Sequence, residues 1–95
     1  PFKFSRIGRW WHKDDEIDIV ALNEGAKEIL FMECKWKHLD HRGASRVIES
    51  LKEKAKRFRW NNEKRKEYFG IMAKKIEDKE KFRKIGYRVF DLDDL

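Results

Sequence analysis

The stretch from Asp15 to Trp36, DEIDIVALNEGAKEILFMECKW, decides the fold of this 95-residue chain. Two runs of β-branched and large apolar residues flank a short polar segment that contains Asn23 and Gly25. These two residue types adopt the backbone angles of tight turns at low cost, and β-branched residues favour strands. The stretch therefore predicts a β-hairpin.

Charged side chains meet across this predicted hairpin. A turn centred on residues 25–26 places Asp18 opposite Glu33 and Glu16 opposite Lys35, with facing Cβ atoms about 4.5–5.5 Å apart. Two facing carboxylates among apolar neighbours repel each other, and a bound divalent cation removes that penalty. Carboxylate oxygens without a partnering His or Cys suit Mg²⁺ or Mn²⁺. The pattern predicts a metal site at Asp18 and Glu33, with the Lys35 ammonium beside it.

Such a site is suited to phosphodiester hydrolysis. The cation would neutralise charge on the phosphate and acidify a water molecule, and Lys35 would stabilise or deprotonate the attacking water. The alternative is that Asp18, Glu33 and Lys35 form an ion-pair lattice on a solvent-facing sheet. Both faces of the hairpin carry apolar residues, as in a sheet covered on two sides, and charges in that setting favour a functional site.

Asp18, followed by Glu33-x-Lys35 at the end of an apolar strand, resembles the catalytic motif of the PD-(D/E)xK nuclease superfamily, which has the restriction-endonuclease-like fold. The chain also resembles the nuclease-like domain of unknown function at the C-terminus of archaeal ATPases. That second resemblance is carried by IGRWW at 7–11, EIDIVAL at 16–22 and FMECKW at 31–36.

The resemblance implies a Mg²⁺- or Mn²⁺-dependent endonuclease acting on DNA. Asp18, Glu33 and Lys35 would be the catalytic residues, with Asp18 and Glu33 as metal ligands and Glu16 as an auxiliary. An ATPase domain of the same chain and a second copy are the implied partners. The fold usually begins with a helix that carries a further acidic residue, whereas Pro1 here leads almost directly to the apolar Phe2 and Phe4. We therefore expect that helix to have been cut away or to be supplied by another subunit, and we expect residues 1–95 to be one domain, the C-terminal part of a longer protein.

The composition is consistent with a nucleic-acid partner. The formal net charge is +6 and 44% of the residues are charged, so a basic excess lies on a surface of mixed sign. A heat-adapted surface of ion-pair networks is the alternative interpretation. Cys34 is the single cysteine, which excludes an intrachain disulfide, and no apolar run approaches the roughly 18 residues of a membrane span. We expect a cytoplasmic protein without membrane contact.

The remaining pattern predicts an α/β fold with a mixed sheet and helical cover. In order we expect a strand at 3–11 with Phe2, Phe4 and Ile7 inward, the hairpin, a helix at 43–60, a strand within 67–76, a helix at 77–85 with Phe82 and Ile85 buried, and a strand at 87–92. Cys34 and Trp36 are expected in the core, with Trp10 and Trp11 covering one end of the sheet. The outer face of the long helix is basic, and its candidate DNA contacts are Lys52, Lys56 and Arg59.

Two other functions compete with the nuclease. The domain could bind DNA or dock on an ATPase without cutting, using the same scaffold. Alternatively, His12, His38 and His41 could hold zinc, although the sequence offers no second pair of ligands with zinc-finger spacing. The acidic end at Asp91, Asp93 and Asp94 is expected to form a tail or to contact a basic neighbour.

Overall fold

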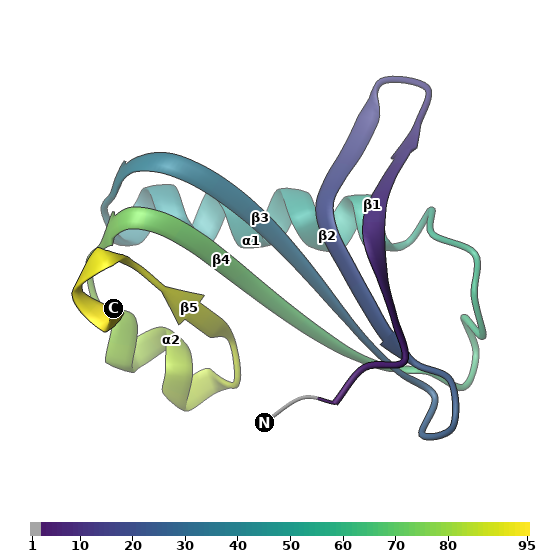
Figure 1. Cartoon of the computed structure of the whole chain (residues 1–95). Helices are drawn as coiled ribbons and strands as arrows, with labels where there is room; N and C mark the ends of the chain where they lie inside the picture. The colour runs from purple at the N-terminus through teal and green to yellow at the C-terminus, as the bar shows by residue number, and fades with distance from the viewer. Residues whose placement is uncertain (1–2) are drawn as a thin grey trace.

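The predicted hairpin is the central part of a five-stranded sheet (Figure 1). The computed structural model describes residues 3–95, so the expectation for Phe2 lies outside the described residues. The strands lie in the order β1-β2-β3-β4-β5. β1, β2 and β3 are antiparallel, and β4 and β5 continue the sheet in parallel. Their bounds are β1 Arg6–His12, β2 Asp15–Asn23, β3 Glu28–Leu39, β4 Lys66–Ile76 and β5 Arg88–Phe90.

The register between β2 and β3 is the one that the turn predicts. Val20 pairs with Phe31, and Leu22 pairs with Ile29. The side-chain oxygen of Asn23 accepts a hydrogen bond from the backbone N–H of Ala26 at 3.0 Å. Local bonds of this kind make asparagine a turn residue. The prediction from turn chemistry and strand alternation is therefore confirmed.

Two helices connect the parallel strands, α1 (His41–Ala55) and α2 (Lys79–Ile85). α1 begins after Asp40, whose carboxylate accepts the backbone N–H of Gly43 at 2.7 Å. The expected helix at 43–60 ends five residues too late, because Arg65 donates to the carbonyl oxygens of residues 55, 58 and 60 and so holds the chain in a non-helical path. α2 ends at Gly86, which adopts φ of 111°, as the sequence predicts.

Both helices cover the same face of the sheet. Ile48 of α1 and Phe82 of α2 belong to one buried cluster with Val89 of β5. Right-handed crossovers from β3 to β4 and from β4 to β5 proceed in one direction along the sheet, which places both helices on one side. No helix of residues 3–95 lies on the opposite face, where Trp36 is 70% exposed. We expected both faces of the sheet to be covered, but the helices of residues 3–95 cover only one face.

Several apolar side chains that we expected in the core lie outside it. We expected a buried position for each of six residues that are exposed: Phe4, Ile7, Trp11, Cys34, Trp36 and Ile85. Phe82, by contrast, is buried as predicted. Ile17 is also buried, but it lies on the same face of the sheet as Val20, whereas strict alternation along the strand would place the two on opposite faces. β2 carries one extra residue between the pairs Gly8–Val20 and Trp10–Ile17, and this bulge turns Ile17 toward α1.

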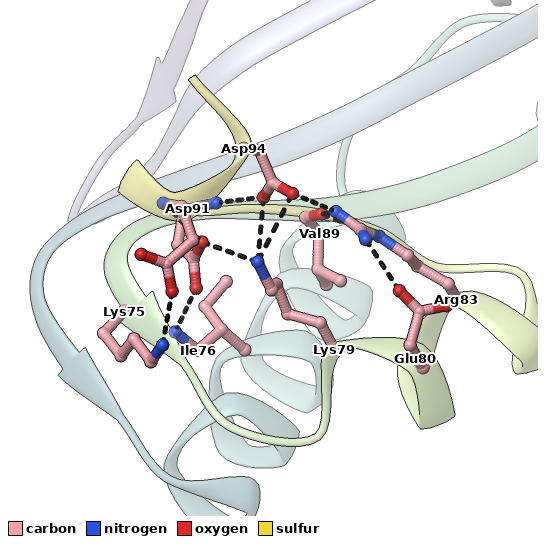
Figure 2. A network of polar contacts seen from close by, with 9 residues as sticks. Lys75, Ile76, Lys79, Glu80, Arg83, Val89, Asp91 and Asp94 are labelled. Atoms are coloured by element: carbon pink, nitrogen blue, oxygen red, sulfur yellow. Dashed lines mark hydrogen bonds and ion pairs between the residues drawn. The ribbon is translucent and has the colours of Figure 1, made fainter.

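The acidic C-terminus folds back onto the molecule instead of forming a free tail (Figure 2). The buried carboxylate of Asp91 accepts from Lys79 Nζ at 2.7 Å and from the backbone N–H of Ile76 at 2.8 Å. Asp94 accepts from Arg83 at 3.1 Å and from the backbone N–H of Asp91 at 2.8 Å. These bonds hold the pKa of Asp94 well below its ordinary value. The expected contact with a basic neighbour is therefore made within the chain. The last strand ends at Phe90, two residues earlier than expected, and a short 3₁₀ helix, η1 (Leu92–Asp94), follows it.

Candidate active site

Asp18 and Glu33 lie where β2 and β3 separate. The recorded pairing of these strands runs from Asn23–Glu28 to Ile19–Met32, and Figure 1 shows the strands diverging beyond it. Asp18 and Glu33 are the next residue in each strand. Asp18 Oδ2 accepts the backbone N–H of Cys34 at 2.9 Å, which fixes the carboxylate across the gap. The structure thus brings the two predicted carboxylates together at this fork.

The two carboxylates titrate in opposite directions. Burial raises the pKa of Glu33, which is 4% exposed, and the neighbouring carboxylate of Asp18 adds to that effect. Burial also acts against ionisation of Asp18, but the backbone N–H of Cys34 and a hydrogen bond with Glu33 together lower its pKa. The same burial and the two carboxylates raise the pKa of the Cys34 thiol, so it is a poor nucleophile.

Lys54 of α1 is the cation that faces Glu33. Its Nζ lies 3.0 Å from Glu33 Oε1, and its side chain is largely buried. Lys54 belongs to the helix face that we expected to be basic and outward, and it was not among the predicted DNA contacts. Helical spacing could have identified Lys54. It follows Val47, one of the apolar residues on the predicted buried face of the helix, by two turns. That spacing puts Lys54 at the border of the buried face.

A basic groove of about 290 Å³ opens beside Glu33 between β3 and α1. Its lining includes one carboxylate and four cationic side chains, so it is suited to an anion with several negative charges. The residues that line it are Glu33, Lys35, Lys37, Leu39, Gly43, Arg46, Val47, Ser50 and Lys54. Lys35 therefore lies in the same groove as Glu33, as the spacing Glu33-x-Lys35 on one strand face predicts.

The residues that line the groove include Glu33 and Lys35 but neither Asp18 nor the other predicted site residues. Glu16 is exposed beyond the fork, where it pairs with Trp11 of β1, and no recorded pair joins it to Lys35. Lys52 donates to the Tyr87 hydroxyl at 2.5 Å and packs on that ring. Two further predicted DNA contacts, Lys56 and Arg59, are exposed near the end of α1 and in the segment after it. The helix was thus predicted correctly as the neighbour of the site, while the lysine that reaches Glu33 was missed.

The donor set fits a hard divalent cation better than zinc. Asp18 and Glu33 are adjacent carboxylates, and Mg²⁺ binds through one or two carboxylates while it keeps several waters. Within residues 3–95, no three His, Cys, Asp or Glu side chains gather around one point. His38 pairs with Glu77 at 2.7 Å and His41 with Asp78 at 3.0 Å, on separate carboxylates. The zinc hypothesis therefore lacks its ligands in the described chain.

Two comparisons by sequence find similar proteins, neither of known function. Residues 1–47, which include Asp18, Glu33 and Lys35, match the model of the DUF234 family, described as archaeal and bacterial proteins of unknown function. An uncharacterized protein of the archaeon Methanocaldococcus jannaschii is 43% identical over 95 residues, which are 100% of this chain and 20% of the relative. The chain thus spans about a fifth of that relative's length.

A solved structure is similar over most of the chain. The crystal structure of a repair endonuclease from Pyrococcus abyssi superposes with a TM-score of 0.54 and 14% sequence identity, and the match covers 90% of this chain and 38% of that one. At this identity the likeness establishes the fold, a mixed sheet of the nuclease-like class. Among residues 3–95, no helix is long and apolar enough to cross a membrane.

Proposed function

We propose that the basic groove is the active site of a Mg²⁺- or Mn²⁺-dependent endonuclease that hydrolyses phosphodiester bonds in DNA. The observation that carries this proposal is the adjacent pair Asp18 and Glu33, with oppositely shifted pKa values, at the head of a groove lined by four cations. Buried adjacent carboxylates cost stability, and perturbed titration of this kind is typical of functional sites. The nuclease-like scaffold and the PD-(D/E)xK resemblance support the same function.

Each groove residue has a role that follows from its charge and position. Asp18 and Glu33 would hold the cation, which would supply charge neutralisation at the scissile phosphate and acidify water. Lys35 would stabilise the negative charge that develops on the phosphate oxygens. Lys37 and Arg46 would bind neighbouring phosphates of the backbone and fix the register of the strand, without reading its sequence.

Lys54 has to change partner during this reaction. In the structure its ammonium neutralises Glu33, so it takes the place of a cation at one carboxylate oxygen. When Glu33 binds a metal, Lys54 would be released toward the groove, where a substrate phosphate would replace the carboxylate as its partner. A metal would bind the ionised form of Glu33, and burial raises the pKa of that carboxyl, so metal affinity should rise as pH rises through the raised pKa.

The experiment is a cleavage assay on linear and branched DNA with Mg²⁺, Mn²⁺ or EDTA, paired with calorimetric metal binding. Asp18→Asn, Glu33→Gln and Lys35→Met should each abolish cleavage, while only the first two should abolish metal binding. Glu63→Gln is a matched control, because this exposed carboxylate lies in the loop between α1 and β4. Metal-independent cleavage, or cleavage retained in Asp18→Asn, would refute the proposal.

Binding without cleavage is the second candidate, and the Lys54–Glu33 ion pair favours it. A lysine that permanently satisfies Glu33 would leave Asp18 as a single free carboxylate, too few ligands to retain a metal. In that case wild type and both carboxylate variants would bind DNA equally, with no metal uptake and no product.

Docking on an ATPase domain would use other surfaces. The variants Asp18→Asn, Glu33→Gln and Lys35→Met would leave such docking unchanged.

A further inference from the structure

A second basic surface, separate from the groove, lies at the other end of the sheet. It is a hollow of about 330 Å³ between β1 and the segment that follows α1. Three arginines, two tryptophans and no carboxylate are among its lining residues. The hollow is lined by Arg6, Ile7, Gly8, Arg9, Trp10, Val20, Leu22, Phe58, Arg59 and Trp60.

The arginines of the hollow lack acidic partners. Arg6, Arg9 and Arg59 are exposed, and among residues 3–95 no ion pair joins any of them to a carboxylate. The other arginines of the same region differ, since Arg57 pairs with Asp15 at 2.5 Å and Arg65 with a glutamate at 2.7 Å. Three guanidinium groups that line one hollow without an ion-paired carboxylate attract a polyanion, and phosphate is the group that guanidinium binds in bidentate geometry.

The aromatic residues of the hollow are held in place from below. Trp10 is half-buried and meets the edge of Phe58 with ring centroids 5.8 Å apart. Phe58 in turn meets Phe31 of the core at 5.7 Å. Trp60, also half-buried, completes the rim. Indole rings that the core fixes in orientation are platforms on which an unpaired base can stack.

Gly8 provides a third, independent observation. It lies in the interior of β1, where glycine weakens a strand, and a Cβ atom built there meets no atom within 4 Å. Packing therefore does not require glycine at this position, and φ is not positive. A glycine in a strand interior marks a β-bulge, and the bulge between β1 and β2 does begin at Gly8, or a place where a ligand approaches the backbone closely. Here that place is the hollow itself.

We propose that this hollow binds unpaired nucleotides of single-stranded DNA, with a base stacked on the tryptophans and phosphates on Arg6, Arg9 and Arg59. A duplex hides its base faces in the stack, so only an unpaired segment can use both features. The inference rests on the proposed function in taking DNA as the ligand, and it adds that the substrate carries a single-stranded part.

The test is equilibrium binding of a labelled single-stranded oligonucleotide by fluorescence anisotropy in EDTA, so that neither metal nor cleavage contributes. Gly8→Phe should fill the hollow and weaken binding at least about fivefold, the lower end of what one stacked base contributes. Arg59→Ala should weaken binding and reduce the slope of log K against log salt by about 0.7, as expected for one lost phosphate contact to a single strand. Lys84→Ala, an exposed lysine at the end of α2, is the control for loss of one charge.

Two comparisons separate this inference from the proposed active site. An oligonucleotide with abasic sites should bind at least about fivefold more weakly than the intact strand, and Gly8→Phe should abolish that difference. Calorimetric Mn²⁺ binding by Gly8→Phe should equal that of wild type, which also shows that the variant is folded. Unchanged single-strand binding in both Gly8→Phe and Arg59→Ala, or equal binding of abasic and intact strands, would overturn the inference while leaving the metal site untouched. Loss of cleavage in Asp18→Asn with single-strand binding retained is the expected pattern if both proposals hold.

Discussion

Replacing Glu33 by glutamine should make the protein more stable at neutral pH while it disables the proposed active site. Glutamine keeps the shape of the side chain, can donate to Asp18 and can accept from Lys54, but it carries no charge. In the wild type, burial raises the pKa of Glu33, so the ionised form is the one that folding penalises. Removing that charge removes the penalty.

The sign and size of the effect follow from the burial of the carboxylate. A group whose pKa is raised by folding contributes stability below its ordinary pKa, near 4.5, and this contribution is lost as pH rises through the raised value. An inadequately compensated buried polar group costs about 1–3 kcal/mol, and the Lys54 ammonium at 3.0 Å offsets part of this cost. We therefore expect Glu33→Gln to gain about 1 kcal/mol at pH 7.5, or about 4–8 °C in Tm for a domain of this size.

The assay is thermal and urea unfolding of wild type and Glu33→Gln from pH 4 to pH 8 in EDTA. The difference in the free energy of unfolding should approach zero near pH 4, where wild-type Glu33 is protonated, and should grow as pH rises. Glu63→Gln should follow the wild-type profile, because that carboxylate is exposed. Parallel profiles for wild type and Glu33→Gln, or a variant that is less stable at pH 7.5, would show that Glu33 is not a strained carboxylate.

Three further substitutions test separate parts of the structure. Lys54→Met should tighten Mn²⁺ binding roughly tenfold in calorimetry, because it removes a positive charge that competes with the metal for Glu33, an effect of at least about 1 kcal/mol. Unchanged affinity would refute this competition. Arg65→Met should lower the free energy of urea unfolding by about 3 kcal/mol, since its guanidinium is 2% exposed and satisfies three backbone carbonyls; a loss below about 1 kcal/mol would contradict that role. Gly70→Ala should lower Tm by about 10 °C or more, because the new Cβ would lie 2.4 Å from the carbonyl oxygen of Arg88 on the next strand, and an unchanged Tm would mean that β5 moves freely.

The hairpin and its register were predictable because local chemistry determines both. Asn23 and Gly25 fix the turn, and the alternation of side chains then places Val20 opposite Phe31. From that register the meeting of Asp18 and Glu33 follows without any knowledge of the rest of the fold. The bulge in β2 changes faces only beyond Asp18, so it did not disturb this part of the prediction.

The parts that failed depend on contacts distant in sequence. Ile17 changed faces because β2 gained one residue relative to β1. Gly8 indicates a bulge at this point of the sheet, but the sequence does not show that β2 carries the extra residue. Trp36 was expected inside because large aromatic residues usually are, but the described helices cover the other face of the sheet. Lys54 looked like a solvated residue of a basic helix, and only the packing of α1 on β3 shows that it faces Glu33. Helical spacing gave the border of the buried face, not the partner across it.

The central claim is that Asp18 and Glu33 together bind a divalent cation that enables cleavage of DNA at the groove. Its most direct test is Mn²⁺ titration by calorimetry at pH 4.5 and pH 8 on wild type, Asp18→Asn and Glu33→Gln, followed by a cleavage assay at pH 8. The account predicts wild-type binding that is tighter at pH 8 than at pH 4.5, because burial raises the pKa of Glu33 above its ordinary value near 4.5, with binding and cleavage lost in both variants. Wild-type protein that binds no metal at either pH, or cleavage that persists in both variants, would contradict it.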